Sequence, residues 1–405
     1  MLYICCIIGV KMRDRIIMFL KTHPRLALRM WVIMRSFMEV WSYFVPLQKK
    51  TILFSSFGGR NFSDSPRALY DMILTRKEFA DWKLIWAFIE PNNFELPRGE
   101  KVKIDTIPFF KALLYSHVWI SNSEVDRGMG LKLKRTIRIE TWHGTPLKKI
   151  CGEENSETFA VKPEDYKGPI DSETIRCAQS EYDRDIFARI FHSSKDSFLL
   201  CDLPRNDELL TFSSQRINDI KDKLQINKER LVILYTPTYR EYLINDKSET
   251  FIAPPINLDK WKEKLGGKYV LLIRAHYAVS AALGIIDDDF VKNVSNYPSL
   301  NELYAVSDMM ISDYSSTYFD YSILDRPMFC FAYDLQEYEE KRGLYLSLEE
   351  TLPCRIHTDE DSLLSEILSF DYQEAVTATS KFRKKFAPYA GHACNTILSE
   401  LLNKL

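Results

Sequence analysis

The chain has 405 residues, of which 46% are hydrophobic and 27% are charged, with only 14 Gly and 17 Pro. This length exceeds one ordinary hydrophobic core, so two domains are expected, and the composition excludes a long disordered tail. The formal net charge of −2 argues against a nucleic-acid-binding protein, which usually has a strongly basic domain, so any basic feature must be local.

The cysteines are typical of a protein in a reducing cytoplasm. Eight are present, and none belongs to a C-x-x-C pair or to a regular spacing. Disulfide frameworks and structural zinc sites both need such spacing, so we expect neither of them.

Residues 1–50 differ from the rest of the chain. The first ten, MLYICCIIGV, are apolar but too few to span a bilayer, which takes about 20 residues. The stretch that follows combines bulky apolar residues, Trp31 and Trp41 among them, with nine Lys and Arg, opposed only by Asp14 and Glu39. This pattern is typical of an amphipathic helix that lies on an anionic membrane surface. A helix docked on the protein's own core is the alternative.

From residue 51 onward, short apolar runs alternate with helical patterns. In the first half, strands are predicted at 51–57, 82–88, 117–122 and 136–142, and helices at 65–74 and 107–116. In the second half, strands are predicted at 230–238, 268–276, 308–313 and 327–333, and helices at 261–265, 300–307 and 315–324. Apolar strands that are each followed by a helix predict parallel sheets covered on both faces.

We therefore expect an α/β protein with two doubly wound, Rossmann-like domains that face a cleft. The first would span residues 51–225 and the second residues 226–405, with the last helix a candidate to pack back on the first domain. The boundary is placed in a polar, charged passage that follows the last short strand of the first half.

Polar side chains cluster where four of these strands end, which is where open α/β sheets bind ligands. The four groups are His143, Gly144, Thr145, Lys148 and Lys149; Thr238 and Arg240; Arg274 and His276; and Asp313, Ser315, Ser316 and Thr317. Three hydroxyls at the start of a helix favour phosphate, because unpaired N–H groups and the positive end of the helix dipole lie there. Simple helix capping and a satisfied strand-end histidine are the structural alternatives.

The neighbouring cations strengthen the phosphate interpretation for the second half. Arg274 and His276 suit the oxygens of a diphosphate, and Thr238 and Arg240 form a second anion contact. We expect the second half to bind a nucleotide diphosphate and the first half to hold the acceptor.

Five motifs give the sequence a family resemblance. WHGTPLK at 142–148, PRND at 204–207, TPTYR at 236–240, RAH at 274–276 and the run at 312–345 resemble the CDP-glycerol glycerophosphotransferase family. Its members are bacterial enzymes that prime or extend teichoic acids and related capsular polymers. The resemblance covers about residues 51 to 390.

The resemblance implies a glycosyltransferase-B-like fold and a peripheral enzyme on the cytoplasmic face of the cell membrane. It implies transfer of an alditol phosphate from CDP-glycerol or CDP-ribitol to a hydroxyl of a lipid-linked acceptor, with release of CMP. Which alditol is used, and whether one unit or many are added, stays open.

The resemblance also implies residue roles. His143 would be the base on the acceptor hydroxyl, His276 would act on the donor diphosphate, and residues 312–316 would surround the donor phosphates. The loop of Gly58, Gly59, Arg60 and Asn61 would face the acceptor; from the residues alone it is equally a plain turn. Lys148 and Lys149 are acceptor-phosphate contacts or a solvated helix face. The chain departs from the family at Tyr277, usually Pro, and at Asp202, often Gly.

The expected chemistry needs few special groups. An alcohol is a poor nucleophile at neutral pH, so a histidine base is expected. Cations and a helix start can neutralise the phosphates, so no cofactor and no protein-bound metal are expected, and Mg²⁺ on the diphosphate stays open. The alternatives are a nucleotide-sugar transferase of the same fold and a non-catalytic, membrane-bound assembly factor.

Overall fold

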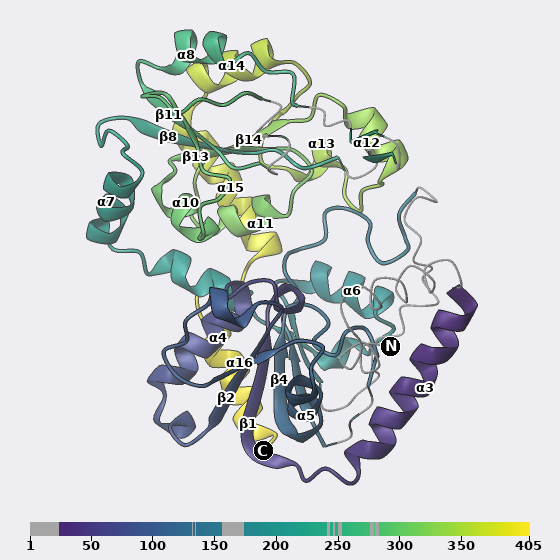
Figure 1. Ribbon diagram of the computed structural model, residues 1–405. Helices are drawn as coiled ribbons and strands as arrows, with labels where there is room; N and C mark the ends of the chain where they lie inside the picture. Colours follow the sequence, from purple (N-terminus) through teal and green to yellow (C-terminus); the bar gives the residue numbers. More distant parts are fainter. Residues whose placement is uncertain are drawn as a thin grey trace.

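The computed structural model describes residues 24–131, 133, 135–155, 174–240, 244–245, 248–249, 253–275, 279 and 283–405. Figure 1 shows two α/β domains, one above the other, joined by a helical connection. The predicted fold class is confirmed, because each domain is built on a parallel sheet with helices on both faces.

The first domain contains a seven-stranded parallel sheet in the order β3-β2-β1-β4-β5-β6-β7. The strands are β1 (Gln48–Ser55), β2 (Lys83–Phe88), β3 (Glu100–Lys103), β4 (Ser116–Ser121), β5 (Ile137–Glu140), β6 (Thr174–Ala178) and β7 (Phe198–Leu200). The helices are α4 (Asp64–Thr75), α5 (Ile107–Tyr115) and α6 (Glu181–Ile190). Successive residues of β1 enter opposite cores, because side chains alternate along a strand: Phe54 packs with α4 and Leu53 with α5.

The second domain contains a six-stranded parallel sheet in the order β12-β11-β8-β13-β14-β15. The strands are β8 (Leu231–Thr236), β11 (Tyr269–Ile273), β12 (Val291–Asn293), β13 (Met309–Ser312), β14 (Met328–Phe331) and β15 (Ile356–His357). The helices are α8 (Leu258–Leu265), α10 (Leu300–Val306), α11 (Thr317–Ser322), α12 (Leu335–Lys341), α13 (Leu348–Thr351), α14 (Glu360–Ser369) and α15 (Tyr372–Phe386). A short hairpin, β9 (Ile244–Asn245) and β10 (Ser248–Glu249), lies outside this sheet.

Both sheets have the same Rossmann-like winding. In each, the first strand lies inside the sheet, the next two add on one side, and the chain then crosses to the other side. Such a sheet binds ligands beyond the carboxyl ends of the strands where the direction of winding reverses. These points lie between β1 and β4 in the first domain and between β8 and β13 in the second.

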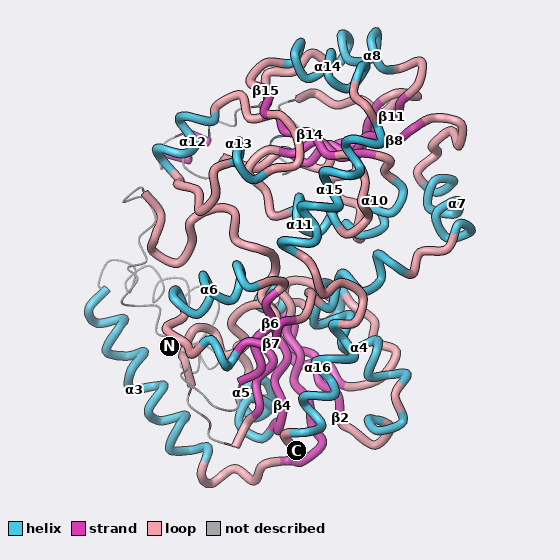
Figure 2. Tube along the Cα trace, turned by 180° about the vertical axis from the view of Figure 1, so that it is seen from behind, coloured by secondary structure: helices cyan, strands magenta, loops and turns pink. Residues whose placement is uncertain are grey.

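Two segments connect the domains. A 3₁₀ helix, η6 (Pro204–Leu210), and α7 (Ser214–Lys223) lead out of the first domain, and α7 packs against α10 of the second. After α15, the chain returns and ends in α16 (Ala393–Asn403), which packs beside α4 on the first sheet (Figure 2). The side chains of Ile397 and Leu398 are fully buried in the first domain's core.

The helix α3 (Pro24–Ser42) runs along the outside of the first domain (Figure 1). Met38 is buried against α5, and Trp41 packs partly against the same cluster. Residues 1–23 and the side chain of Trp31, which belong to the predicted membrane segment, lie outside the described residues. Of the helices described, none is both long and apolar enough to cross a bilayer.

Candidate functional site

His143 lies in the turn that follows β5, and its ring is held in one orientation. Its Nδ1 is 2.9 Å from the carbonyl oxygen of Asn122, which follows β4. A carbonyl only accepts, so Nδ1 carries the proton and donates, which leaves the lone pair on Nε2. The Trp142 ring stacks on the imidazole with centroids 4.3 Å apart. Trp142 has a φ of +55°, a backbone conformation that residues other than glycine rarely adopt, so the backbone is strained next to His143.

The surroundings of His143 favour the neutral imidazole. Burial lowers the pKa of His143; the Asn122 carbonyl and Asp64 act in the opposite direction, and Arg205 lowers the pKa further. A neutral ring with a free Nε2 lone pair is the form that accepts a proton.

The loop after β1 lies beside this turn. Asn122 Oδ1 accepts from the backbone N–H of Phe57 at 2.8 Å, and Ser123 Oγ accepts from that of Gly58 at 2.9 Å. Gly59 has a φ of +83°, and a Cβ there would lie 2.1 Å from Ile104 Cδ1 and 3.0 Å from the Ala87 carbonyl oxygen, so only glycine fits. Gly58 also has a positive φ, of +62°, so both glycines have a structural explanation.

The other predicted acceptor residues differ in accessibility. Arg60 and Asn61 are exposed beyond the loop. Thr145 is 1% exposed, and its Oγ1 lies 2.8 Å from Gln179 Oε1 and 3.0 Å from Asp183 Oδ2. That hydroxyl is part of the framework behind His143, and this geometry favours a structural role over a contact with the acceptor.

The segment of Lys148 and Lys149 pairs with the second domain. The backbone N–H of Lys149 donates to the Gly343 carbonyl at 3.0 Å, and Lys148 forms a β-bridge with Leu344. The side chain of Lys149 donates to Asn155 Oδ1 at 2.9 Å. Both lysines therefore lie in a strap between the domains, and their role as anion contacts stays a prediction.

In the second domain, Arg240 and Asp313 form a buried framework. Asp313 accepts from the backbone N–H of Thr238 at 2.9 Å and pairs with Arg240 Nη1 at 2.9 Å. The other Arg240 nitrogens donate to Asp334 at 2.7 and 2.9 Å, and the Arg240 side chain is 3% exposed. All three nitrogens of this guanidinium already have partners, so the geometry favours a structural ion pair over the predicted anion contact.

The predicted hydroxyl cluster lies at the start of α11. That helix spans only Thr317–Ser322, shorter than the predicted 315–324. Ser315 Oγ accepts from the N–H of Thr317 at 3.2 Å, and Thr317 Oγ1 donates to Ser312 Oγ at 3.3 Å. The start of this helix follows the carboxyl end of β13, as predicted, and β13 borders the winding reversal of the second sheet.

Of the remaining predicted donor residues, Arg274 donates from Nη1 to the Tyr297 carbonyl at 2.6 Å. Thr238 Oγ1 is buried without a hydrogen-bond partner among the described residues. His276 and Tyr277 lie outside those residues, so their roles stay predictions.

The His143 turn of the first domain contacts the start of α11 in the second domain. Gly144 has a φ of +149°, and a Cβ on it would lie 2.7 Å from Ser316 Oγ and 3.1 Å from Ser316 Cβ. The turn that carries His143 is therefore packed against the start of α11. The turn of His143, the predicted base, and the hydroxyl cluster of the second domain therefore lie next to each other.

The family model for CDP-glycerol:poly(glycerophosphate) glycerophosphotransferase matches residues 37–403. The chain belongs to this family. Its sequence is 33% identical to a teichoic acid poly(glycerol phosphate) polymerase of Staphylococcus epidermidis, over 88% of this chain and 51% of that protein. It is also 33% identical to a teichoic acid glycerol-phosphate transferase of Staphylococcus aureus, over 84% of this chain and 89% of the relative. The chain thus spans about half the length of the first relative and most of the second.

Solved structures agree with this assignment. The wall teichoic acid polymerase TagF matches with a TM-score of 0.81 at 30% identity, over 96% of this chain and 97% of that one. A UDP-GlcNAc 2-epimerase from Neisseria meningitidis matches with a TM-score of 0.54 at 11% identity, which shows a shared fold alone. The family resemblance, the enzyme class and the two-domain fold expected from the sequence are confirmed.

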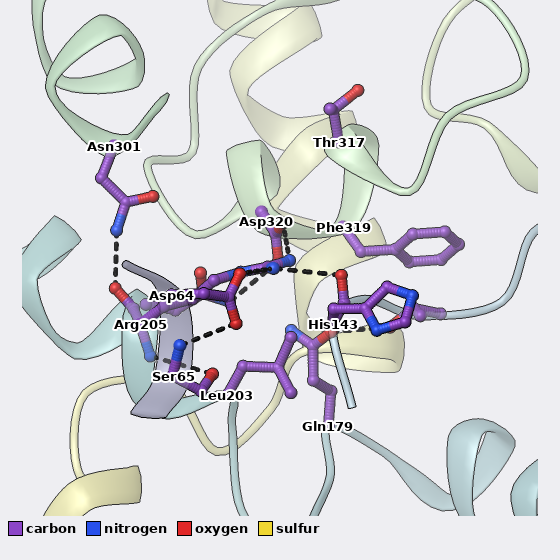
Figure 3. A network of polar contacts seen from close by, with 12 residues as sticks. Asp64, Ser65, His143, Gln179, Leu203, Arg205, Asn301, Thr317, Phe319 and Asp320 are labelled. Atoms are coloured by element: carbon purple, nitrogen blue, oxygen red, sulfur yellow. Dashed lines mark hydrogen bonds and ion pairs between the residues drawn. The ribbon is translucent and has the colours of Figure 1, made fainter. Parts of the chain in front are cut away.

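One part of the site in this glycerophosphotransferase was not predicted. Arg205, in η6, pairs through Nη1 with Asp64 at the start of α4 and through Nη2 with Asp320 in α11, both at 2.6 Å. Nη1 also donates to the carbonyl of His143 at 3.0 Å (Figure 3). Asn206 Nδ2 donates to Asp320 at 2.9 Å. Arg205 and Asn206 belong to the PRND motif, which carried the resemblance but no assigned role. The PRND motif was therefore the feature of the sequence that could have identified these two residues.

Proposed function

We propose that this glycerophosphotransferase moves glycerol phosphate or ribitol phosphate from the corresponding CDP-alditol to a hydroxyl of a lipid-linked acceptor in the synthesis of a teichoic acid or capsular polymer. The geometry of His143 carries the mechanism, because its Nδ1 is committed to the Asn122 carbonyl and its Nε2 is left to take a proton. The family of the chain supports the donor class.

The names of the relatives support the same substrates. They include polymerases of poly(glycerol phosphate), a glycerol-phosphate primase and a ribitol-phosphate primase, all of teichoic acid. A TagF variant soaked with CDPG is among the similar structures. These names do not separate the two alditols for this chain.

The proposed step is a single displacement at phosphorus. The acceptor oxygen attacks the β-phosphorus of the CDP-alditol and loses its proton to Nε2 of His143. A new P–O bond forms, the bond between the β-phosphorus and the bridging oxygen breaks, and CMP leaves with that oxygen. The remaining task is to position the reactants and to balance charge on the phosphoryl oxygens. We assign that task to the start of α11, to Arg274 and to His276.

The test is nucleotide release from defined donors. Purified protein is incubated with a lipid-like acceptor and with CDP-glycerol, CDP-ribitol or a UDP-sugar, and CMP and UDP are measured. CMP release that depends on the acceptor, from one or both CDP-alditols, is expected. Release of UDP from the sugar donor would contradict the proposal, and so would the absence of release from every donor.

We also propose that the protein acts as a peripheral enzyme at the cytoplasmic face of the membrane, through α3. The exposed apolar side chains of α3 and the residues just after it form an outward stripe: Val32, Ile33, Phe37, Val40, Tyr43 and Phe44, each between 53% and 78% exposed. Lys49 and Lys50 follow at the surface. An apolar stripe with adjacent basic residues suits the interface of an anionic bilayer, where a lipid-linked acceptor is found.

A further inference from the structure

Arg205 joins three parts of the chain that are far apart in sequence. Its guanidinium contacts Asp64 in α4, Asp320 in α11 and the main chain at His143. The side chains are largely buried, with exposed fractions of 15% for Arg205, 8% for Asp64 and 4% for Asp320. Figure 3 shows the arginine between the two carboxylates, beside the His143 turn.

Stability alone explains this arrangement poorly. Buried ion pairs are expensive to desolvate, and well-packed apolar residues often stabilise a protein as well or better. What a guanidinium supplies is a rigid fork of donors that fixes several acceptors in one geometry. Here that fork connects the backbone of the predicted base to a helix of the other domain.

The contact between Gly144 and Ser316 lies next to this fork. A Cβ at Gly144 would also lie 3.7 Å from Arg205 Nη2, so turn, arginine and helix α11 form one packed unit. A shift of Arg205 would therefore displace the His143 turn relative to α11.

We propose that Arg205 is a positioning residue for the transfer. It holds the backbone of His143 in the first domain against α11 of the second, and so fixes the position of the base relative to the donor-binding groups. This inference rests on the proposed function, since it assigns His143 the role of base. It assigns Arg205 no contact with either substrate.

The charges around His143 provide a signature that a purely structural role would not give. Asp64 and Arg205 are the charged groups that act on the imidazole; the Asn122 carbonyl, Trp142 and Phe57 are its uncharged neighbours. Removing the Arg205 cation should raise the pKa of His143, and removing the Asp64 anion should lower it.

The experiment compares Arg205→Met, Arg205→Lys and Asp64→Asn in the full chain. Arg383→Met is the matched control, because Arg383 makes a similar two-point pair with Asp325, at 2.8 and 3.1 Å, away from His143. The ring of His143 is titrated by NMR and assigned with a His143→Gln variant. The kcat and KM for CMP release and the thermal unfolding temperature are measured for each protein.

We expect the His143 pKa to rise in Arg205→Met and to fall in Asp64→Asn, because the first loses a nearby cation and the second a nearby anion. In Arg205→Lys the charge is kept but the fork is lost, so the pKa should stay near that of the natural protein. The kcat of Arg205→Lys should fall at least about tenfold with little change in donor KM. Arg383→Met should match the natural protein in both measurements.

The proposal is overturned if folded Arg205→Lys keeps its kcat within about threefold of the Arg383→Met control. It is also overturned if Asp64→Asn leaves the His143 pKa unchanged. Should Arg205→Met fail to fold, these two variants carry the test. If the natural protein releases no CMP, the proposed function fails, whereas the NMR titration still reports on the contacts of Arg205.

Discussion

At the scale of single residues, main-chain groups decide the chemistry of His143. The Asn122 carbonyl selects the tautomer, and the Arg205 guanidinium binds the His143 carbonyl. The strand-end position of His143 could be predicted from the apolar run before it. Its partners could not, because hydropathy does not tell which loop of a neighbouring strand will face it.

Arg205 shows the same limit more sharply. Its surroundings in sequence, LPRNDELL, are polar and charged, which predicts a solvated connection between domains. In the structure its side chain is 15% exposed, because two carboxylates from elsewhere compensate the charge. Burial of a compensated charge depends on distant residues and leaves no periodic pattern.

His143→Ala should abolish transfer and leave CDP-alditol binding largely intact, because the proposed donor groups lie in the second domain. The measurements are CMP release and calorimetric binding of the CDP-alditol, with the exposed His392→Ala as the control. In the natural protein, kcat/KM should fall as the pH drops through the His143 pKa, since the protonated ring accepts no proton. Burial lowers that pKa, so the loss should begin below the ordinary value of 6.5. Substantial turnover in His143→Ala would remove the base assignment.

At the scale of elements, the central strands were predictable and the outer ones were not. A continuous apolar run in the sequence coincides with each of the strands predicted, which are β1, β2, β4, β5, β8, β11, β13 and β14. The edge strands β3 and β12 are short and partly polar: β3 has the exposed Glu100 and Lys103, and β12 has the half-buried Lys292 and the exposed Asn293. Charged and polar side chains on an edge strand discourage pairing with another chain. The strand β6, TIRCA, is buried throughout although it contains Arg176, so its apolar run is interrupted.

The helix α3 docks on the protein's own core, which was the alternative interpretation of the N-terminal segment, while its membrane role stays a prediction. One face docks on α5 through Met38, as a core-packed helix does, and the other exposes Ile33, Phe37 and Val40. The sequence pattern predicted an amphipathic helix with one apolar face. It did not predict that α3 would have apolar residues both on the face that docks on α5 and on the face exposed to solvent.

Phe37→Ser combined with Phe44→Ser should weaken binding to vesicles of anionic lipid, since each substitution removes apolar area from the outward stripe. The measurement is co-sedimentation at low and moderate salt. Ile286→Ser is the matched control, because Ile286 is 82% exposed but lies in the second domain. Equal sedimentation of the double variant and the control would refute the role of α3.

At the scale of the whole molecule, two buried carboxyls link stability to pH. Asp183 and Asp202 lie in the polar framework behind the His143 turn, where Gln179 contacts both. Burial raises the pKa of each to about 7, against 3.8 for an ordinary aspartate. Between pH 3.8 and about 7, the folded state therefore keeps protons that the unfolded chain has lost. The stabilisation of the folded state by these protons is complete in acid and disappears as the pH rises through about 7.

Asp202→Asn should flatten this dependence, because it removes one of the two titrations. For each carboxyl, the free energy of unfolding falls by on the order of 1 kcal/mol per pH unit between the unfolded pKa of 3.8 and the folded pKa of about 7. Thermal unfolding from pH 5.5 to 8.5 measures it, with the exposed Asp259→Asn as the control. A variant whose unfolding temperature declines as steeply as that of the natural protein would contradict the assignment.

The return of α16 to the first domain has a consequence for how the chain is made. Ile397, Leu398 and Leu401 complete the core that contains Ile52 and Phe54, although some 340 residues separate the two groups. A ribosome releases the N-terminal half first, and domains generally begin to fold in that order. The first domain must therefore wait, with one face of its sheet only partly covered, until α16 has been synthesised. The second domain can complete its own core before the first, so the order of completion is the reverse of the order of synthesis.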